Sequence, residues 1–378
     1  MINYGKQSIN QSDIKSVIDV LKKDHLTQGP TIKIFEHQLK KFFGFKHCAV
    51  VSNGTAALYI AAKSLEWKEK DHIITTPNTF VATANCILHV GAKPEFVDID
   101  KDTYTIDVEK VEDRLKKLNG KVKAIIAVDY AGHPCDWKSL KFLSKKYNLK
   151  LINDNCHALG AKINGDMKYA SKYADIVTHS YHPVKTITTG EGGSIFTNDA
   201  KLYKKFVLYR NNGIVKNKNF SPWEYKVKEL SMNFRLSDIQ CALGISQLKR
   251  LNKFVLKRNE IAKYYSKKFE SISNLKVPKV KNNFYHAFHL YPLLIDFHKT
   301  KINKKNFFLK LKKKGINLQV HYIPLHHHPV LKKFSNKKDL LCVEQFYKKE
   351  VSLPIYPDLK LFEIKKVINE VINLIYKK

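Results

Sequence analysis

Apolar, β-branched runs alternate with helix-period segments between residues 49 and 200. The predicted strands are Ala49–Val51, Ile73–Thr76, Glu95–Val97, Val122–Val128, Leu149–Ile152 and Ile176–Thr178. Apolar spacing predicts helices between them, over Thr55–Leu65, Phe80–His89, Val108–Leu118 and Trp137–Tyr147. Strands that alternate with helices of about ten residues are typical of βαβ units. The pattern therefore predicts an α/β fold with a largely parallel sheet.

A further helix is predicted ahead of this region, in the stretch "SDIKSVIDVLKK". Ile14, Val17, Ile18 and Leu21 recur at helical spacing, so they would share one apolar face. Ser12 stands just before them and is a candidate N-cap. We therefore expect an amphipathic N-terminal helix that begins at Ser12.

The pattern changes beyond about residue 250. Helical spacing covers Leu248–Phe269, and the stretches "AFHLYPLLI" and "NLQVHY" resemble strands. A lysine-rich helix that ends at Gly315 and a terminal helix complete this part. We therefore expect a large domain over residues 1–250 and a smaller C-terminal α+β domain over residues 251–378.

Composition narrows the class of protein. The chain has 378 residues and is 44% hydrophobic, which is enough for a large core and excludes a disordered or fibrous chain. We find no apolar run of membrane-spanning length and no signal peptide. The six cysteines lie far apart, without a C-x-x-C pair. Isolated cysteines favour reduced thiols, so we expect a cytoplasmic protein.

The charge of the chain is strongly positive and uneven. The net charge is +33, and residues 201–378 carry 39 Lys and Arg against 12 Asp and Glu. One reading is a surface that binds nucleic acid or another polyanion. The other is a lysine-rich solvated surface, which we favour because the lysines interrupt ordinary amphipathic patterns such as "NFFLKLKKKG". No zinc-finger spacing or RNA-binding signature accompanies the charge, so a nucleic-acid partner is not expected.

Candidate chemistry follows three of the predicted strands. The first strand leads into "SNGTAAL", where the N–H groups at Gly54 and Thr55 open a helix and suit a phosphate. The strand that ends at Ile152 leads into "DNCHALGA", with Asp154 and His157. Each signal alone is weak, because small residues at strand–helix turns are common and an aspartate there often caps a turn.

The third strand leads into "SYHPVKTITTGEGG", in which Ser180 could join the anion site and Lys185 precedes a glycine-rich turn. A dry pocket lowers the pKa of a lysine and makes its neutral amine available for covalent chemistry. Phe80, after another strand, could supply a flat apolar face, although alone it would be a core residue. A lysine, a carboxylate, a phosphate seat and an aromatic face together match pyridoxal phosphate.

Eight ordered blocks, which cover nearly the whole chain, resemble the DegT/DnrJ/EryC1/StrS family of sugar aminotransferases. They are "HLTQGPTIKIFEHQLKKFFG", "VSNGTAAL", "TTPNTFVATAN", "VDYAGHPCDW", "DNCHALGA", "SYHPVKTITTGEGG", "NFRLSDIQCALGISQL" and "QVHYIPLHHHP". The resemblance implies a fold-type-I pyridoxal-phosphate-dependent transferase, with a large domain built on a mixed, mostly parallel sheet and a small C-terminal α+β domain. The residues of several blocks look closest to those of the branch that makes the 4-amino precursor of pseudaminic acid.

The resemblance also implies roles for single residues around pyridoxal 5'-phosphate. Lys185 would bond to the cofactor's aldehyde and later move a proton at the substrate carbon. Asp154 would keep the ring nitrogen protonated, as a carboxylate within about 4–6 Å does. Phe80 would stack on the ring, and His157 would contact its phenolic oxygen. The remaining cofactor contacts would be Gly54, Thr55 and Ser180 on the phosphate, and Asn233 on the phosphate of a neighbouring subunit.

The implied partners are L-glutamate as amino donor, a UDP-linked 4-keto sugar as acceptor, and a second copy of the chain. Because Asn233 would reach across, the active site would be shared within a homodimer. Other acceptors of the family, with amination at C3 or C4 and another nucleotide base, remain open alternatives. The substrate contacts carried over from the family are Tyr4, Leu26, Thr27, His321 and Tyr322.

A histidine-rich stretch near the end of the chain is a candidate metal-binding site. Its members are His321, His326, His327 and His328. No cysteine or carboxylate stands near them in the sequence to complete a ligand set, and the resembled family uses no metal here. We therefore expect no metal, and we expect "HHH" to be exposed loop.

Overall fold

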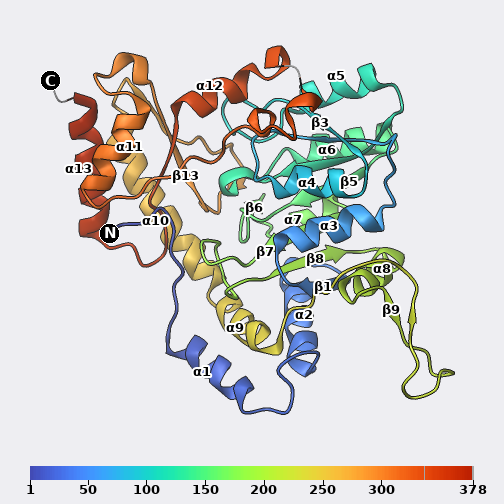
Figure 1. The fold of residues 1–378 in the computed structure, drawn as a ribbon. Helices are drawn as coiled ribbons and strands as arrows, with labels where there is room; N and C mark the ends of the chain where they lie inside the picture. The colour runs from blue at the N-terminus through green and yellow to red at the C-terminus, as the bar shows by residue number, and fades with distance from the viewer. Residues whose placement is uncertain (336, 377–378) are drawn as a thin grey trace.

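Seven strands form the central sheet of the computed structural model, which describes residues 1–335 and 337–376 (Figure 1). The strand order is β1-β8-β7-β5-β4-β2-β3. β8 runs antiparallel to its neighbours β1 and β7, and the remaining pairs are parallel. The bounds are β1 His47–Val51, β2 His72–Thr75, β3 Lys93–Phe96, β4 Val122–Val128, β5 Lys150–Asp154, β7 Ile176–Ser180 and β8 Gly193–Thr197.

The predicted α/β fold with a mostly parallel sheet is confirmed. All six strands expected between residues 49 and 200 are present, and their ends differ from the prediction by at most two residues. The sequence pattern missed β8, whose five residues directly follow the glycine-rich turn. Its antiparallel direction makes the sheet mixed.

Helices cover both faces of the sheet because successive strand residues point to opposite sides. In β4, Ile125 and Ala127 join one apolar cluster, whereas Ala124 and Ile126 join another. The first cluster packs against α2, α5, α6, α7 and α9, and the second against α3, α4 and α8. The bounds are α2 Pro30–Phe43, α3 Gly54–Ser64, α4 Ala82–His89, α5 Val108–Leu118, α6 Trp137–Lys146, α7 Tyr169–Tyr173, α8 Ala200–Arg210 and α9 Asp238–Leu248.

The N-terminal helix α1, Gln11–Leu21, differs from the prediction in two ways. Its N-cap is Asn10 rather than Ser12, because Asn10 and Asp13 form a reciprocal capping box. Its expected apolar face is exposed in the single chain, with Ile14, Ile18 and Leu21 at 44%, 43% and 52% exposure. This face therefore has no covering within the described part of one chain.

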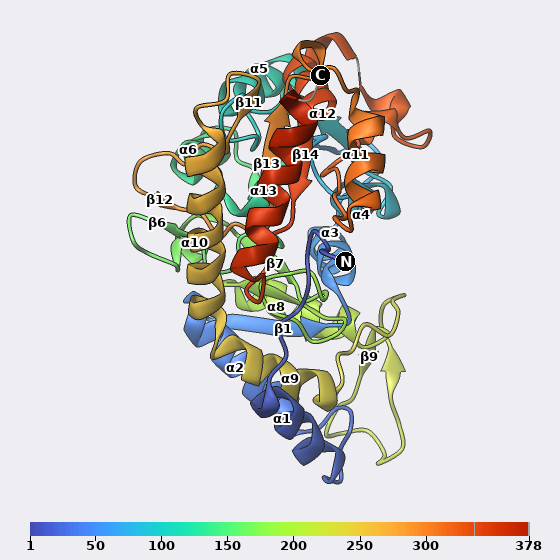
Figure 2. The same ribbon diagram turned by 90° about the vertical axis from the view of Figure 1, so that its left-hand side faces the viewer.

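The C-terminal part is built on a second, three-stranded sheet of order β11-β13-β14. Helices α10, α11 and α13 pack around it, as Figure 2 shows. Ile2 joins the same apolar cluster, so the first residues of the chain lie with this part. The bounds are α10 Leu251–Phe269, β11 Leu275–Lys276, β13 Tyr291–Ile295, α11 Lys304–Lys313, α12 Leu341–Lys349, β14 Glu350–Leu353 and α13 Leu361–Tyr376.

The helix expected over Leu248–Phe269 is present as α10, which begins three residues later than predicted and ends at Phe269. Another C-terminal expectation needs correction. The stretch "NLQVHY" is not a strand: it makes one bridge, between Gln319 and Ser352, and then the N–H of His321 donates to the Glu350 carboxylate instead of a backbone carbonyl. The division of the chain at residue 250 stays a prediction.

Two observations bear on compartment and membrane. All six cysteines are free thiols, as the sequence predicted. Among residues 1–335 and 337–376, no helix combines the length and the apolar character needed to cross a membrane.

Candidate active site

A cavity of about 750 Å³ lies where β4, β5 and β7 end. In a sheet of parallel strands this edge is where ligands bind. Ten of the thirteen predicted site residues line the cavity: Tyr4, Gly54, Thr55, Phe80, Asp154, His157, Ser180, Lys185, His321 and Tyr322. A second hollow of about 790 Å³, between α2 and α8, contains none of the thirteen. The chemistry that the sequence indicated therefore converges on the first cavity.

Lys185 enters the cavity from the loop that follows β7. Its backbone N–H donates to the His182 carbonyl at 2.9 Å, which closes the turn that carries the side chain. Burial lowers the pKa of the Lys185 amine, and this effect exceeds the opposite influence of Cys156 and Asp154. The environment thus favours the neutral amine, which is the nucleophilic form.

Asp154 is the last residue of β5 and is buried. The Thr83 hydroxyl donates to its Oδ2 at 2.8 Å, and the Cys156 N–H donates to its Oδ1 at 3.3 Å. Thr79 and Thr83 share a further hydroxyl contact at 2.9 Å. These donors orient the carboxylate within the cavity. Thr83 is not among the predicted site residues, and its only sequence signal is its place in the "TTPNTFVATAN" block.

The N-terminus of α3 forms another wall of the cavity. Asn53 caps the helix by accepting the Ala56 N–H at 2.8 Å. A Cβ atom at Gly54 would lie 2.9 Å from the Ser180 Cβ and 3.3 Å from the Cys156 Sγ, so only glycine fits there without displacement. The helix end therefore stands directly beside the Ser180 hydroxyl. Unpaired N–H groups of a first helical turn and a nearby hydroxyl make a seat for an anion.

The aromatic residues of the cavity are arranged around His157. Phe80 is 55% exposed although it is large and apolar, and this exposure is into the cavity that it lines. The Ala131 N–H donates to His157 Nδ1 at 3.3 Å, so the proton of the neutral ring is on Nε2, which lies 2.9 Å from the Tyr322 hydroxyl. Burial, Lys185 and His321 lower the pKa of His157 well below its usual value, which keeps the ring neutral.

A buried hydrogen-bond chain behind the cavity orients His321. The Ser352 hydroxyl donates to Glu350 Oε1 at 2.5 Å, and it lies 2.8 Å from His321 Nδ1. Since the single Ser352 proton is used on Glu350, the serine oxygen accepts, and Nδ1 carries the proton of the ring. Burial and Lys185 lower the pKa of His321 to about 3. His321 is therefore a neutral imidazole whose Nε2 is an acceptor.

Three predicted site residues lie outside the cavity of their own chain. Leu26, Thr27 and Asn233 are exposed, and none of them lines it. Leu26 and Thr27 lie beside the start of α9, because Thr27 bridges to Ser237 and Asp238 donates its N–H to the Leu26 carbonyl at 2.9 Å. The expectation that Leu26 and Thr27 approach the substrate is not met within one chain.

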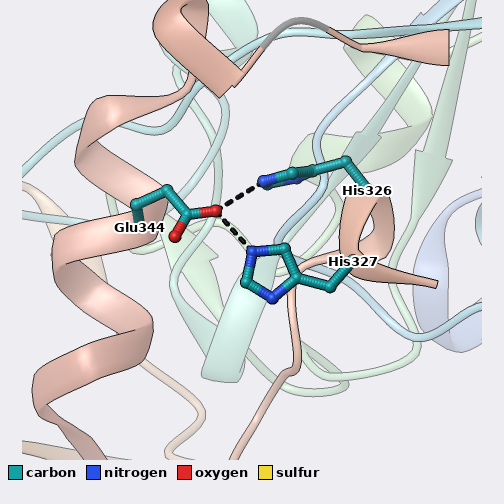
Figure 3. A group of neighbouring side chains, drawn as sticks. All are labelled: His326, His327 and Glu344. Atoms are coloured by element: carbon teal, nitrogen blue, oxygen red, sulfur yellow. Dashed lines mark hydrogen bonds and ion pairs between the residues drawn. The ribbon is translucent and has the colours of Figure 1, made fainter. Parts of the chain in front are cut away.

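The expectation that "HHH" is an exposed loop is wrong for part of the stretch. His326 and His327 belong to a 3-10 turn, η3 Leu325–His327, and His326 is buried rather than exposed. A carboxylate that the local sequence did not reveal stands beside them: Glu344 of α12 contacts both rings (Figure 3). Local sequence could not show this contact, because Glu344 reaches the turn only through packing of α12.

The cavity fits pyridoxal phosphate by its donor set. It combines a half-buried lysine of lowered pKa, a buried aspartate, a helix N-terminus beside a serine and a cavity-facing phenylalanine. The cofactor needs an amine for its aldehyde, a carboxylate for its ring nitrogen and a cradle for its phosphate. Fold and site together define the class of the protein as a pyridoxal-phosphate-dependent aminotransferase.

Comparison with known proteins gives the family. The model of the DegT/DnrJ/EryC1/StrS aminotransferase family matches residues 7–372, and the chain belongs to that family. It is 40% identical over 377 residues to the UDP-4-amino-4,6-dideoxy-N-acetyl-beta-L-altrosamine transaminase of Campylobacter jejuni strain 81-176, covering 100% of this chain and 98% of the relative.

Solved structures agree with this assignment. Helicobacter pylori PseC, an aminotransferase involved in the biosynthesis of pseudoaminic acid, superposes with a TM-score of 0.92 at 35% identity, over 100% of both chains. Spr1654 of Streptococcus pneumoniae in its PMP form superposes with a TM-score of 0.90 at 26% identity, again over 100% of both chains. The protein is thus a sugar aminotransferase. This assignment replaces the alternative interpretation, drawn from the positive charge of residues 201–378, that the protein is a dedicated polyanion binder.

The hydrogen-bond chain behind His321 generates a prediction. Replacing Ser352 by Ala removes the acceptor that holds the proton on Nδ1, so His321 would sample both tautomers. We expect kcat/KM of the aminotransferase to fall about tenfold, the equivalent of one hydrogen bond of about 1.4 kcal/mol. Ser352→Thr keeps a hydroxyl and should restore most of the rate in steady-state kinetics.

Ser144→Ala is the matched control, because Ser144 is also buried and bonded but sits on α6, where its hydroxyl donates to the Lys141 carbonyl. Equal rates for the wild type and Ser352→Ala would contradict the role of the chain, as would an equal loss from Ser144→Ala.

Proposed function

We propose that the protein transfers the amino group of L-glutamate to the 4-keto carbon of a UDP-linked 4-keto-6-deoxy-N-acetyl hexose, in nucleotide-sugar biosynthesis of the pseudaminic acid type. The observation that carries the proposal is the meeting of Lys185 and Asp154 in one cavity of about 750 Å³. The choice of sugar rests on relatives at 36% and 40% identity that are named for an altrosamine transaminase.

Pyridoxal phosphate, when bound, supplies an aldehyde that carries an amino group and a ring that absorbs negative charge. Lys185 Nζ is suited to accept and return a proton at the substrate carbon, since burial favours its neutral form. Asp154, oriented by Thr83, is suited to hold a proton on the ring nitrogen. Gly54, Thr55 and Ser180 are suited to hold the phosphate at the start of α3.

The part of the cavity beyond Lys185 is suited to the sugar. Tyr4 and His321 lie side by side there, with ring centroids 5.1 Å apart. Tyr322 also packs against His321, with ring centroids 5.0 Å apart and nearly perpendicular planes. We propose that the Nε2 acceptor of His321 receives a hydroxyl or amide N–H of the sugar, because its Nδ1 is already bonded to Ser352.

We also propose a homodimer with shared active sites. Support comes from unusual exposure of apolar side chains around the hairpin of β9, Ile214–Val215, and β10, Lys226–Val227, which projects from the body in Figure 1. Trp223 and Leu230 are 82% and 86% exposed, and α1 leaves its apolar face uncovered. Large apolar side chains left exposed in this way are typical of an interface. Asn233 stands next to this surface and outside its own cavity, where it would be available to a partner.

A cytoplasmic location completes the proposal. The six free thiols, four of them buried, suit a reducing compartment.

A substrate panel tests the sugar assignment. The purified enzyme would be incubated with L-glutamate and the 4-keto sugar made from UDP-N-acetylglucosamine by C5-inverting dehydration. The C5-retaining epimer and 4-keto-6-deoxy sugars on other nucleotides serve as controls, with product mass as the readout. We expect kcat/KM for the inverted UDP-sugar to exceed the others by about tenfold or more. A preference for another nucleotide or for C3 amination would replace this sugar, and amination of none would refute the proposal.

Substitutions test the two chemical roles. Lys185→Ala removes the amine and should lower turnover by roughly 10³-fold or more. Asp154→Asn removes the negative charge and should cause a loss of similar size. Matched controls are the exposed Lys201→Ala and Asp113→Asn, which lie on α8 and α5 and should leave turnover unchanged. Near-normal rates from either cavity variant would overturn the assigned role.

Mixing two inactive variants tests the shared site. Lys185→Ala and Asn233→Asp damage different residues, so a mixed dimer has one site with both defects and one with neither. Co-expressed equal amounts should recover about a quarter of wild-type turnover, because half of the dimers are mixed and each has one intact site.

No recovery, in dimers that native mass spectrometry of differently tagged chains proves to be mixed, would contradict a site shared between chains. A monomeric enzyme with full turnover would refute the dimer.

A further inference from the structure

Two imidazole nitrogens and one carboxylate oxygen meet outside the active-site cavity. His326 and His327 present them from the turn η3, and Glu344 from the first half of α12 (Figure 3). His326 Nε2 lies 2.6 Å and His327 Nε2 lies 2.5 Å from the same oxygen, Glu344 Oε1. The three atoms all lie within 4.8 Å of one another. None of these residues lines the cavity that holds Lys185.

Packing holds the rings in this arrangement. The His326 side chain is fully buried, and the His327 ring stands nearly perpendicular to it, with centroids 4.7 Å apart. The His327 ring also meets the Tyr347 ring, with centroids 5.5 Å apart and again nearly perpendicular planes. The His327 and Glu344 side chains keep 24% and 20% exposure, so the cluster is open to water on one side. It thus has three fixed donors and an accessible position.

We propose that this cluster is a binding site for a divalent transition-metal ion of the zinc type. Two histidines and a glutamate with one open position are a known ligand set for zinc, with bonds of about 2.0–2.2 Å. Ligand atoms around a tetrahedral ion at those bond lengths lie roughly 3.3 Å apart. The two nitrogen–oxygen separations, 2.6 and 2.5 Å, are shorter than that value, and all three atoms lie within 4.8 Å, so the donors are already gathered within the reach of one ion. Imidazole ligands favour zinc, nickel or copper over magnesium or calcium.

The protons balance in a simple way. Without metal, both imidazoles donate from Nε2 to Glu344 Oε1. On binding, two metal–nitrogen bonds and one metal–oxygen bond form, and the ion loses the waters that they replace. A neutral ring moves its proton from Nε2 to Nδ1 through solvent, and a protonated ring releases one proton to water. No oxidant or reductant takes part.

The position of the site indicates a bracing role. The residues on either side of the histidine pair, Leu325 and His328, do line the active-site cavity. An ion held by His326, His327 and Glu344 would therefore tie this wall of the cavity to α12. Binding to the folded state alone also raises the apparent stability of the protein.

The experiment measures zinc bound to the tag-free holoenzyme, because a polyhistidine tag would itself take up metal. After treatment with a chelator and desalting, each protein is dialysed to equilibrium against Zn²⁺, and bound zinc is measured by mass spectrometry. The variants are His327→Ala and Glu344→Gln, with the exposed His298→Ala as the matched control. Cobalt in place of zinc gives a second readout through its visible d–d absorption, which is independent of turnover.

We expect the wild type and His298→Ala to bind one zinc ion per chain beyond any bound by His327→Ala or Glu344→Gln. The two cluster variants should bind it at least about tenfold more weakly, and their circular dichroism should match that of the wild type. Equal zinc content in the wild type and both cluster variants would overturn the proposal. The proposal would also be overturned if the wild type took up no zinc and the two cluster substitutions lowered only the melting temperature. The cluster would then be a hydrogen-bonded clamp between η3 and α12.

Discussion

The protonation state of one half-buried lysine is the constraint around which the rest of the structure is arranged. Burial disfavours the charged form of the Lys185 amine, while Asp154 pulls in the opposite direction. Such a balance exists only where water is largely excluded and a carboxylate is held close. The edge of a parallel sheet supplies both conditions, because β5 and β7 end side by side and their connecting loops close over them.

The neighbouring helices and the C-terminal part hold the groups around Lys185 in position. Thr83 of α4 binds Asp154, and Gly54 lets the start of α3 approach Ser180 without a steric clash. On the far side, the C-terminal part contributes His321 and Tyr322, and their hydrogen bonds determine which imidazole nitrogen carries a proton. The two parts of the chain therefore line different sides of the cavity. The large sheet supplies the residues that suit the cofactor, and the C-terminal part supplies polar groups of defined orientation.

The segment from His321 to His328 contacts both the active-site cavity and α12. His321 and His328 line the cavity, whereas His326 and His327, between them in sequence, turn away toward Glu344. Four histidines within eight positions thus serve two environments. Burial keeps His321 neutral, and hydrogen bonds to Glu344 hold the turn against α12.

The sequence by itself determined the α/β class, six of the seven strands of the central sheet and seven of the residues that line the cavity, because these depend on local periodicity and on motifs at strand ends. The cavity residues Tyr4, His321 and Tyr322 followed from the family resemblance instead. Only the tertiary structure decided that "NLQVHY" is not a strand and that Thr83, Ser352 and Glu344 are partners of other residues. The physical reason is distance along the chain. Contacts between residues far apart in sequence arise from packing of whole elements, and a single sequence carries no local signal for them.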